Sequence, residues 1–171
     1  MEPTLIADER TQLEQFLDTN REELVETLEG LTEDQARARL VPSLTTPLAL
    51  VKHVTWAEQV WFHVGLAGRT REELGIPHEN DPSWTVAAGD TVESVIAEYR
   101  RVCSEAREIA APYALDDLVL HNRRGPLTLR WLYLHMIEEI ARHAGHADIL
   151  REQILTGCWL SPKPIGQTCR D

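Results

Sequence analysis

Apolar residues recur at helical spacing in four long segments of the chain, over about residues 5–28, 47–66, 92–111 and 129–156. Charged and polar residues occupy the positions between them, as in amphipathic helices that bury one face. The apolar positions are Leu13, Phe16, Leu17, Leu24, Leu28, Leu50, Val54, Ala57, Trp61, Val92, Val95, Ile96, Tyr99, Val102, Ala106, Ile109, Leu129, Leu132, Met136, Ile140, Ala147, Leu150 and Ile154. No stretch shows sustained apolar/polar alternation, and no repeat has a fixed period. The pattern predicts an all-α fold, and four helices of this length favour a four-helix bundle.

Residues that typically begin and end helices lie near the ends of these four segments. Hydroxyl and carboxyl side chains cap helix starts, while glycine and proline end helices. The expected starts are Thr46-Pro47, Thr128 and the capping boxes Thr32–Gln35 and Asp90–Glu93, and the expected ends are Gly30, Pro112 and Gly157. The box at Thr32–Gln35 opens only a short helical turn.

Two connections between the predicted helices are long and lack any period, one over residues 67–89 with a lone Trp84 and one over residues 113–127. Connections of this length are usually functional or mobile. The tail over residues 157–171 is predicted to be irregular because prolines interrupt it. We expect a single domain over residues 1–171, since this is an ordinary length for one domain.

The chain is acidic, with 17 Lys+Arg against 28 Asp+Glu and a formal net charge of −11. Nucleic acids and anionic membrane surfaces are poor partners for such a protein, because they attract clustered cations. No apolar run approaches the roughly 18 residues that a membrane span needs, and the start MEPTLIADER has no basic flank before an apolar run. We expect a cytoplasmic protein whose cysteines, Cys103, Cys158 and Cys169, are free thiols.

Candidate chemistry lies in the last predicted helix, in the stretch HMIEEIARHAGH. His135, Glu139 and His143 follow one another at steps of four residues, and His146 lies three residues further on. At about 100° per residue, His143 falls within the apolar arc of its helix and points inward. His135 and His146 lie nearer the edge of that arc, which suits a supporting position around a site.

A further candidate ligand, His53, lies among apolar residues of the second predicted helix, and its rival His63 lies near the end of that helix. Taken singly, an inward histidine is more often a hydrogen-bonded core residue, and Glu139 with His143 can be an ordinary intrahelical pair. Buried imidazoles and carboxylates are costly unless paired, and a divalent cation between them satisfies both. As a set, His53, Glu139 and His143 favour a three-ligand site with open positions, the usual form of catalytic zinc.

The chain resembles the DinB-like superfamily of metal-binding four-helix bundles, in particular its thiol-dependent transferase and maleylpyruvate-isomerase branch, and is similar to the DUF664-type members. The resemblance rests on PLALVKHVTWAEQVWF (47–62), TLRWLYLHMIEEIARHAGHADIL (128–150) and the order of helices around them. In that superfamily one histidine comes from the second helix and two ligands four residues apart come from the last, which correspond here to His53, Glu139 and His143. Many members have histidine where this chain has Glu139, so its set resembles the mycothiol-dependent isomerase branch.

The resemblance implies an open-sided divalent metal that binds a low-molecular-weight thiol and lowers its pKa. The thiolate then attacks an electrophilic small molecule or catalyses an isomerisation, with zinc as the first expectation and nickel or manganese as alternatives. The electrophile is expected to enter between the two long connections, where the candidates are Trp84, His121, Asn122, Arg123 and Arg124. Arg123 and Arg124 form a basic pair that suits an acidic substrate, or simply a solvated loop.

Two other functions stay open. The same ligands with a metal-bound water would make a hydrolase of an amide or ester, although the available bases, Glu138 and Asp148, point away from His143. A fourth ligand, His135 or His146, would close the shell and favour a non-catalytic metal-binding stress-response bundle. A homodimer is expected from the resemblance alone.

Overall fold

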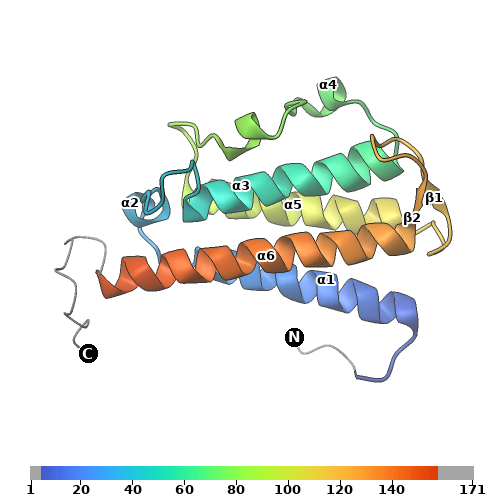
Figure 1. The fold of residues 1–171 in the computed structure, drawn as a ribbon, viewed down its shortest axis with the longest axis horizontal. Helices are drawn as coiled ribbons and strands as arrows, with labels where there is room; N and C mark the ends of the chain where they lie inside the picture. The colour runs from blue at the N-terminus through green and yellow to red at the C-terminus, as the bar shows by residue number, and fades with distance from the viewer. Residues whose placement is uncertain (1–4, 158–171) are drawn as a thin grey trace.

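The computed structural model describes residues 5–157, and its main feature is four long helical segments that lie side by side (Figure 1). They are α1 (Glu9–Glu26), α3 (Pro47–Glu58) continued by the π-helical η1 (Gln59–Leu66), α5 (Val92–Ala110) and α6 (Leu129–Thr156). The shorter elements are α2 (Glu33–Ala36), α4 (Arg71–Leu74), the 3-10 helix η2 (Asp81–Trp84), β1 (Leu118–Val119) and β2 (Leu127–Thr128). The protein is mostly helical, as the sequence predicts. Nearly all of the predicted tail, with Cys158 and Cys169, lies outside the described residues.

Several predicted helix ends are confirmed. The hydroxyls of Thr46 and Thr128 each accept a backbone N–H from the first turn of the helix that follows. Thr32 and Gln35 form the predicted capping box before the short α2. Gly157 ends α6 with a φ of 65°, a backbone conformation that residues with a Cβ rarely adopt.

Two helix starts differ from the prediction. The capping box before α5 is built by Thr91 and Ser94, one residue later than expected, because the Asp90 carboxylate pairs with a lysine of α3 instead. Helix α1 begins at Glu9 rather than at residue 5, since the Asp8 side chain accepts a backbone N–H of the first turn.

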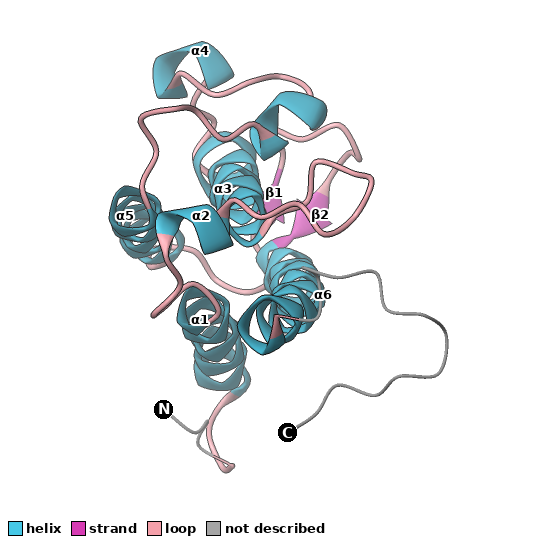
Figure 2. Ribbon diagram, turned by 90° about the vertical axis from the view of Figure 1, so that its left-hand side faces the viewer, coloured by secondary structure: helices cyan, strands magenta, loops and turns pink. Residues whose placement is uncertain are grey.

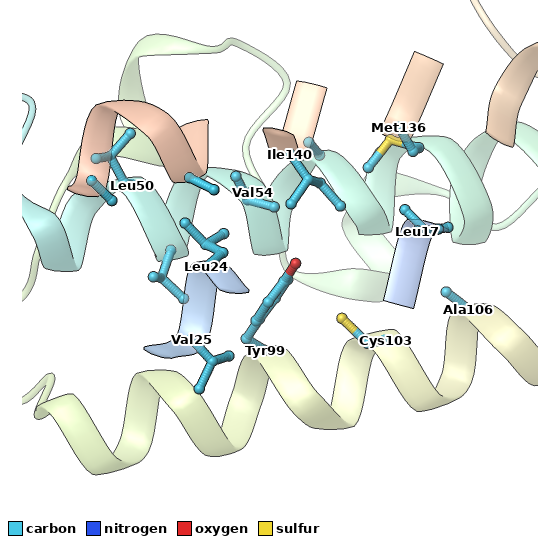
Figure 3. Packing of buried hydrophobic residues seen from close by; sticks show 14 of the residues in the cluster. Leu17, Leu24, Val25, Leu50, Val54, Tyr99, Cys103, Ala106, Met136 and Ile140 are labelled. Atoms are coloured by element: carbon cyan, nitrogen blue, oxygen red, sulfur yellow. The ribbon is translucent and has the colours of Figure 1, made fainter. Parts of the chain in front are cut away.

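The apolar faces of the long segments share one interior. Helix α1 packs mainly against α6, while α3 packs against both α5 and α6. Figure 3 shows Leu24, Leu50, Val54, Tyr99 and Ile140, from α1, α3, α5 and α6, gathered in the same space, and all five are fully buried. Among the described residues no helix is both long and apolar enough to cross a bilayer.

Phe16 is an exception to the predicted core. Its exposed fraction is 49%, whereas that of the adjacent Leu17 is 1%. Neighbouring residues of a helix point about 100° apart. Because α1 packs mainly against one helix, its buried face is narrow, and the prediction that Phe16 joins the core is wrong.

The second long helix changes to π geometry at Gln59. In η1 the N–H of Ala67 donates to the carbonyl of Phe62, five residues earlier, at 3.0 Å. A wider turn rotates the residues that follow it relative to an α-helical projection. His63 is fully buried there, although the sequence pattern places it near a helix end, and its Nε2 lies 3.3 Å from Oε2 of Glu105.

The two long connections contain short elements that the hydrophobic pattern does not reveal. Helices α4 and η2 fall within residues 67–89, and η2 packs against α3, on the side of α3 that faces away from α1 (Figure 2). The other connection ends in the antiparallel pair β1–β2, with Leu118 opposite Thr128 and Val119 opposite Leu127. The fold is therefore not purely helical, because strands of two residues are too short to show alternation.

Candidate metal centre

His53 of α3 meets Glu139 and His143 of α6 where the two helices pack against each other. One nitrogen or oxygen from each of the three side chains lies within 4.8 Å of the other two. Oε1 of Glu139 is 3.6 Å from Nε2 of His53 and 3.2 Å from Nε2 of His143. Both histidines are buried, with exposed fractions of 5% and 7%. The packing of α3 on α6 thus joins residues that are about 90 positions apart in the chain.

The imidazole of His53 is held from behind by the η2 segment. Its Nδ1 lies 2.8 Å from Oγ of Ser83, and that hydroxyl donates its own hydrogen to the carbonyl of Asn80 at 2.5 Å. Because a hydroxyl has one hydrogen, Ser83 must accept the Nδ1–H of His53. This contact places a hydrogen on Nδ1 of His53 and turns Nε2 toward Glu139, so Nε2 is the atom of this ring that could bind a metal.

Aromatic rings cover the histidines. The ring of Trp84 stacks on His53 with 4.0 Å between ring centroids and 11° between planes. Trp56 also stacks on His53, at 5.8 Å, and donates its Nε1–H to the carbonyl of Pro77. His143 meets the rings of His53 and Trp84 edge-on, at 5.0 and 5.6 Å. The side of the site formed by α3 and η2 is therefore lined by aromatic rings.

The carboxylate of Glu139 is strongly held in its ionised form. Hydrogen bonding to His143, and then to His53, lowers the pKa of Glu139 well below its usual value, against the opposing effect of burial. Arg142 lies on the solvent side, 3.3 Å from Oε2. The site therefore presents one negative charge beside two imidazole rings.

This donor set fits a divalent metal. Two imidazole nitrogens and a carboxylate are a common three-ligand set for catalytic zinc. Nδ1 of His143 is buried with no hydrogen-bond partner in the described part of the chain, so Glu139 is its main polar neighbour. Between residues 5 and 157 no further His, Cys, Asp or Glu joins the group, which leaves positions for other ligands on a bound ion.

His135 and His146 lie beside this group but are not part of it. The ring of His135 stacks on Trp131 at 4.9 Å and meets Trp61 edge-on, and burial lowers its pKa. His146 is exposed, with its ring 5.7 Å from that of His143. Neither histidine therefore closes the shell from the described part of the chain.

A family model described as mycothiol-S-transferase matches residues 12–156, which includes all of the helices above except the first three residues of α1. The chain belongs to the mycothiol-S-transferase family. It thus lies in the DinB-like group that the sequence resembles. A search among curated proteins finds no match.

One solved structure with the same fold is the crystal structure of "the conserved protein of locus from Enterococcus faecalis". It is 17% identical to this chain, with a TM-score of 0.66, and the alignment covers 89% of this chain and 99% of that protein. At this identity the likeness concerns the arrangement of the helices alone.

In this member of the family, the residues predicted to line the entry path of the electrophile have different surroundings. Trp84 lies against the candidate ligands, as described above. Arg124 lies over the rings of Trp61 and Trp131, at 5.8 and 5.4 Å, next to the ring of His135 one turn before Glu139. Arg123 is exposed, and its charge acts on Arg71 of α4.

The other two predicted mouth residues have structural partners. The side chain of His121 packs against the backbone of Gly68, where an added Cβ would lie 3.0 Å from the ring. The Asn122 side chain donates to the carbonyl of Val119 and accepts the N–H of Arg124. His121 attaches the second connection to the end of η1, whereas Asn122 stabilises a turn within that connection, and neither contacts the three candidate ligands.

Sequence analysis did not identify Ser83, the hydrogen-bond partner of His53. No periodic signal exists in its segment, and the only local hint is the adjacent Trp84. Trp56 lies three residues after His53 on the same helix, so its position beside that ring follows from helical spacing.

Proposed function

We propose that this protein is a metal-dependent S-transferase that joins a low-molecular-weight thiol of the mycothiol type to an electrophilic small molecule. The observation that carries the proposal is the group of His53, Glu139 and His143, with Nε2 of His53 turned toward the group and no fourth ligand among the described residues. Membership of the mycothiol-S-transferase family supports the choice of thiol. Isomerisation assisted by the same thiol uses the same site.

The three side chains have separate tasks. His53 and His143 would each supply one neutral imidazole nitrogen, and Glu139 would supply the only formal negative charge. When bound there, a divalent metal lowers the pKa of a thiol and stabilises its thiolate at neutral pH. The hydrogen bond from His53 to Ser83 would hold the imidazole in the orientation in which Nε2 faces Glu139.

Neighbouring groups would shape access to this site. Trp84 and Trp56 shield the His53 side from water, which strengthens electrostatic interactions within the site. Arg124, held over two tryptophan rings, is our candidate for contact with an acidic electrophile. His135 is proposed as support next to Glu139. Arg123, whose charge acts on Arg71 of α4, and the exposed His146 remain weaker candidates.

The transferase is favoured over a hydrolase by the absence of a suitably placed base among the described residues. A hydrolase of this kind needs a group to deprotonate a metal-bound water. Glu138 is exposed and pairs with Arg142, and Asp148 is exposed as well. The open shell likewise favours a catalytic role over a purely stabilising one.

We further propose that the long helical segments form a DinB-like four-helix bundle in a single domain over residues 1–171. Zinc is our first choice of metal, because imidazole and carboxylate ligands suit it, with nickel or manganese next. A homodimer is retained as a hypothesis.

The decisive experiment measures metal content and turnover together. Protein reconstituted with zinc, nickel or manganese is expected to bind about one ion per chain and to conjugate mycothiol to a fluorogenic alkylating reagent. His53→Ala, Glu139→Ala and His143→Ala should each lose most of the metal and the turnover, while His63→Ala keeps both. Wild-type protein without metal after reconstitution, or full turnover in Glu139→Ala, would contradict the proposal.

A further inference from the structure

A cavity of about 310 Å³ lies between residues 37–46, which lead into α3, and residues 84–86, at the end of η2. In Figure 1 these segments lie near the end of the bundle where α3 begins. The volume is at the lower end of the roughly 300–1,000 Å³ of small-molecule pockets. The cavity contains none of the candidate metal ligands, but Trp84 borders it and also stacks on His53. A ligand here would therefore contact the ring that covers His53.

Two arginines line this cavity, and no acidic residue lines it in the described part of the chain. Nη2 of Arg37 donates to the backbone carbonyls of Ala87, at 3.1 Å, and of Asp90. Arg39 donates in the same way to two backbone carbonyls, those of residues 41 and 42. A guanidinium has five N–H donors, so these contacts leave donors for a further acceptor. Backbone carbonyls thus hold both side chains in place and leave their positive charges without a carboxylate.

The carboxylates beside Arg37 in the chain or in space have other partners. Asp90, whose carbonyl Arg37 binds, directs its carboxylate to Lys52 and to the N–H of Ala87. Glu33, one helical turn before Arg37, accepts the N–H of Val92. Within the described residues, Arg37 therefore forms no ion pair.

A second cavity shows what pairing does to such a site. It measures about 210 Å³, lies between α1 and α5, and is lined by Arg21, Arg100 and Arg107. Each of these arginines forms an ion pair with a carboxylate of α1 or α3. The protein thus neutralises the arginines between α1 and α5 by itself. At Arg37 and Arg39 the carboxylate would have to come from a ligand.

Apolar side chains form much of the remaining wall of the cavity beside the two arginines. They are Leu44, Val86 and the indole of Trp84. The exposed fraction of Leu44 is 53%, so a ligand can still remove apolar surface from water there. Guanidinium groups bind carboxylates with matched geometry, and apolar walls favour a hydrocarbon body. The combination fits an organic acid better than an inorganic anion, which has no apolar part.

We propose that this cavity binds a small organic carboxylate. Arg37 and Arg39 hold the carboxylate group, and Trp84 packs against the apolar body of the ligand. Binding requires neither a metal nor a thiol, so the inference is independent of the proposed function. Two sources have this chemistry, a free carboxylic acid and an electrophilic substrate that carries a carboxylate.

The first experiment titrates 4-methylbenzoate and its neutral analogue 4-methylbenzamide by calorimetry, at constant ionic strength. The full chain is used after treatment with EDTA, so that no metal can bind the carboxylate. A charge-assisted hydrogen bond should make the acid bind the wild type about tenfold more tightly than the amide. Arg37→Gln and Arg39→Gln should each remove most of this preference. If Arg37→Gln loosens the connection that it holds, Arg39→Gln still decides, because Arg39 contacts only carbonyls close to it in the chain.

Arg151→Gln is the matched control. Arg151 also donates to backbone carbonyls, those of Thr27 and Glu29, but it does not line the cavity. Its substitution should leave the preference for the acid unchanged. No binding of 4-methylbenzoate to the wild type, equal affinity for acid and amide, or a preference that survives in Arg39→Gln overturns the proposal.

The second experiment distinguishes the two sources of the carboxylate. Metal-loaded protein receives mycothiol with 4-(bromomethyl)benzoate or 4-(bromomethyl)benzamide, so the sulfur bonds to the benzylic carbon and bromide leaves. If the electrophile supplies the carboxylate, Arg39→Gln raises the KM for the benzoate alone, by about three- to tenfold. Unchanged KM values, with binding of 4-methylbenzoate intact in the first experiment, assign the cavity to a free carboxylic acid. Failure to transfer mycothiol to either reagent contradicts the proposed function, and the first experiment still decides the cavity.

Discussion

Two carboxylates face the interior of this protein from different helices, and their neighbours differ. Glu58, at the end of α3, is fully buried, and its two oxygens each accept a hydrogen bond of 2.7 Å from Arg21. Glu139, on α6, lies between the imidazoles of His53 and His143. The protein thus neutralises Glu58 with a buried permanent cation, whereas the permanent cation beside Glu139, Arg142, lies on the solvent side and the buried neighbours of Glu139 are imidazoles.

The surroundings of Glu58 form a closed cluster, which we define as Arg21, Glu58, Tyr99 and Cys103. Desolvation opposes the charge of Arg21, but Glu58 outweighs it, and the pKa of Arg21 is raised. Burial raises the pKa values of Tyr99 and Cys103, so both stay neutral and Cys103 is a poor nucleophile. Removing one partner of a buried ion pair is strongly destabilising, whereas a partly buried carboxylate without a buried cation marks a candidate site.

The largest effect should come from removing one partner of the closed cluster. Glu58→Ala removes the buried carboxylate that accepts two hydrogen bonds from Arg21 and leaves that buried guanidinium only the partly exposed Asp18, so we expect the free energy of unfolding to fall by about 3–5 kcal/mol. Glu139→Ala removes a partly exposed carboxylate and should cost the metal-free protein much less. Urea unfolding of both metal-free variants makes the comparison. Equal losses would mean that the two carboxylates have the same structural role.

Removing the metal should lower the thermal stability only when the Glu139 site is intact. A metal that joins α3 to α6 stabilises the native state by about 2.7 kcal/mol when its free concentration is 100 times Kd. We expect EDTA to lower the Tm of the loaded wild type and to leave the Tm of Glu139→Ala unchanged, as scanning calorimetry would show. An EDTA-resistant Tm in the wild type would argue against a metal between the helices.

Loss of the hydrogen bond to His53 should weaken metal binding without weakening the fold. Ser83→Ala removes the acceptor that orients the imidazole, and such changes typically lower metal affinity about 10- to 100-fold. Competition with a chromogenic chelator measures the affinity, and urea unfolding of the metal-free protein checks stability. Ser104→Ala, on the exposed face of α5, is the control. Unchanged affinity in Ser83→Ala would remove this residue from the site.

The smallest effect concerns His63, a fully buried histidine of η1 that lies beside Glu105 of α5. Desolvation lowers its pKa despite the nearby Glu105, so the unfolded chain takes up a proton more readily than the folded protein. The contribution of neutral His63 is therefore complete above the unfolded pKa of about 6.5 and is lost as the pH falls below it. We expect His63→Gln to flatten the pH dependence of the unfolding free energy between about pH 7.5 and 5.5. An equally steep curve in the variant would assign that dependence to other groups.

Local features were predictable because each depends on residues close in the chain. Thr46, Thr128 and the Thr32 box cap their helices as expected, since capping joins residues three positions apart. Glu139 and His143 meet because residues four apart share a helix face. The two errors have a tertiary cause. Packing against another helix buries Leu17 rather than the adjacent Phe16, and the ion pair of Asp90 with α3 leaves Thr91 to cap α5.

Other features depend on segments that are distant in the chain. The π-helical η1 and the two-residue strands leave no periodic signal that could predict them. Arg124 lies over the rings of Trp61 and Trp131 because the β1–β2 connection folds back over α6 and η1. The sequence pattern placed Arg123 and Arg124 together, but the structure separates their surroundings.

By itself, the sequence determined the long helices, their caps and the inward direction of His53, Glu139 and His143, because helical geometry and capping act over a few residues. Only the tertiary structure decided which polar groups are paired. The contact between Arg21 and Glu58 spans 37 positions, and that between His53 and Ser83 spans 30. Such pairs form when packing brings two distant segments side by side in one register, and the spacing of apolar residues within a segment carries no information about that register. Packing therefore pairs Glu58 with Arg21 inside the protein and places Glu139 between His53 and His143, where the three side chains could hold a metal ion.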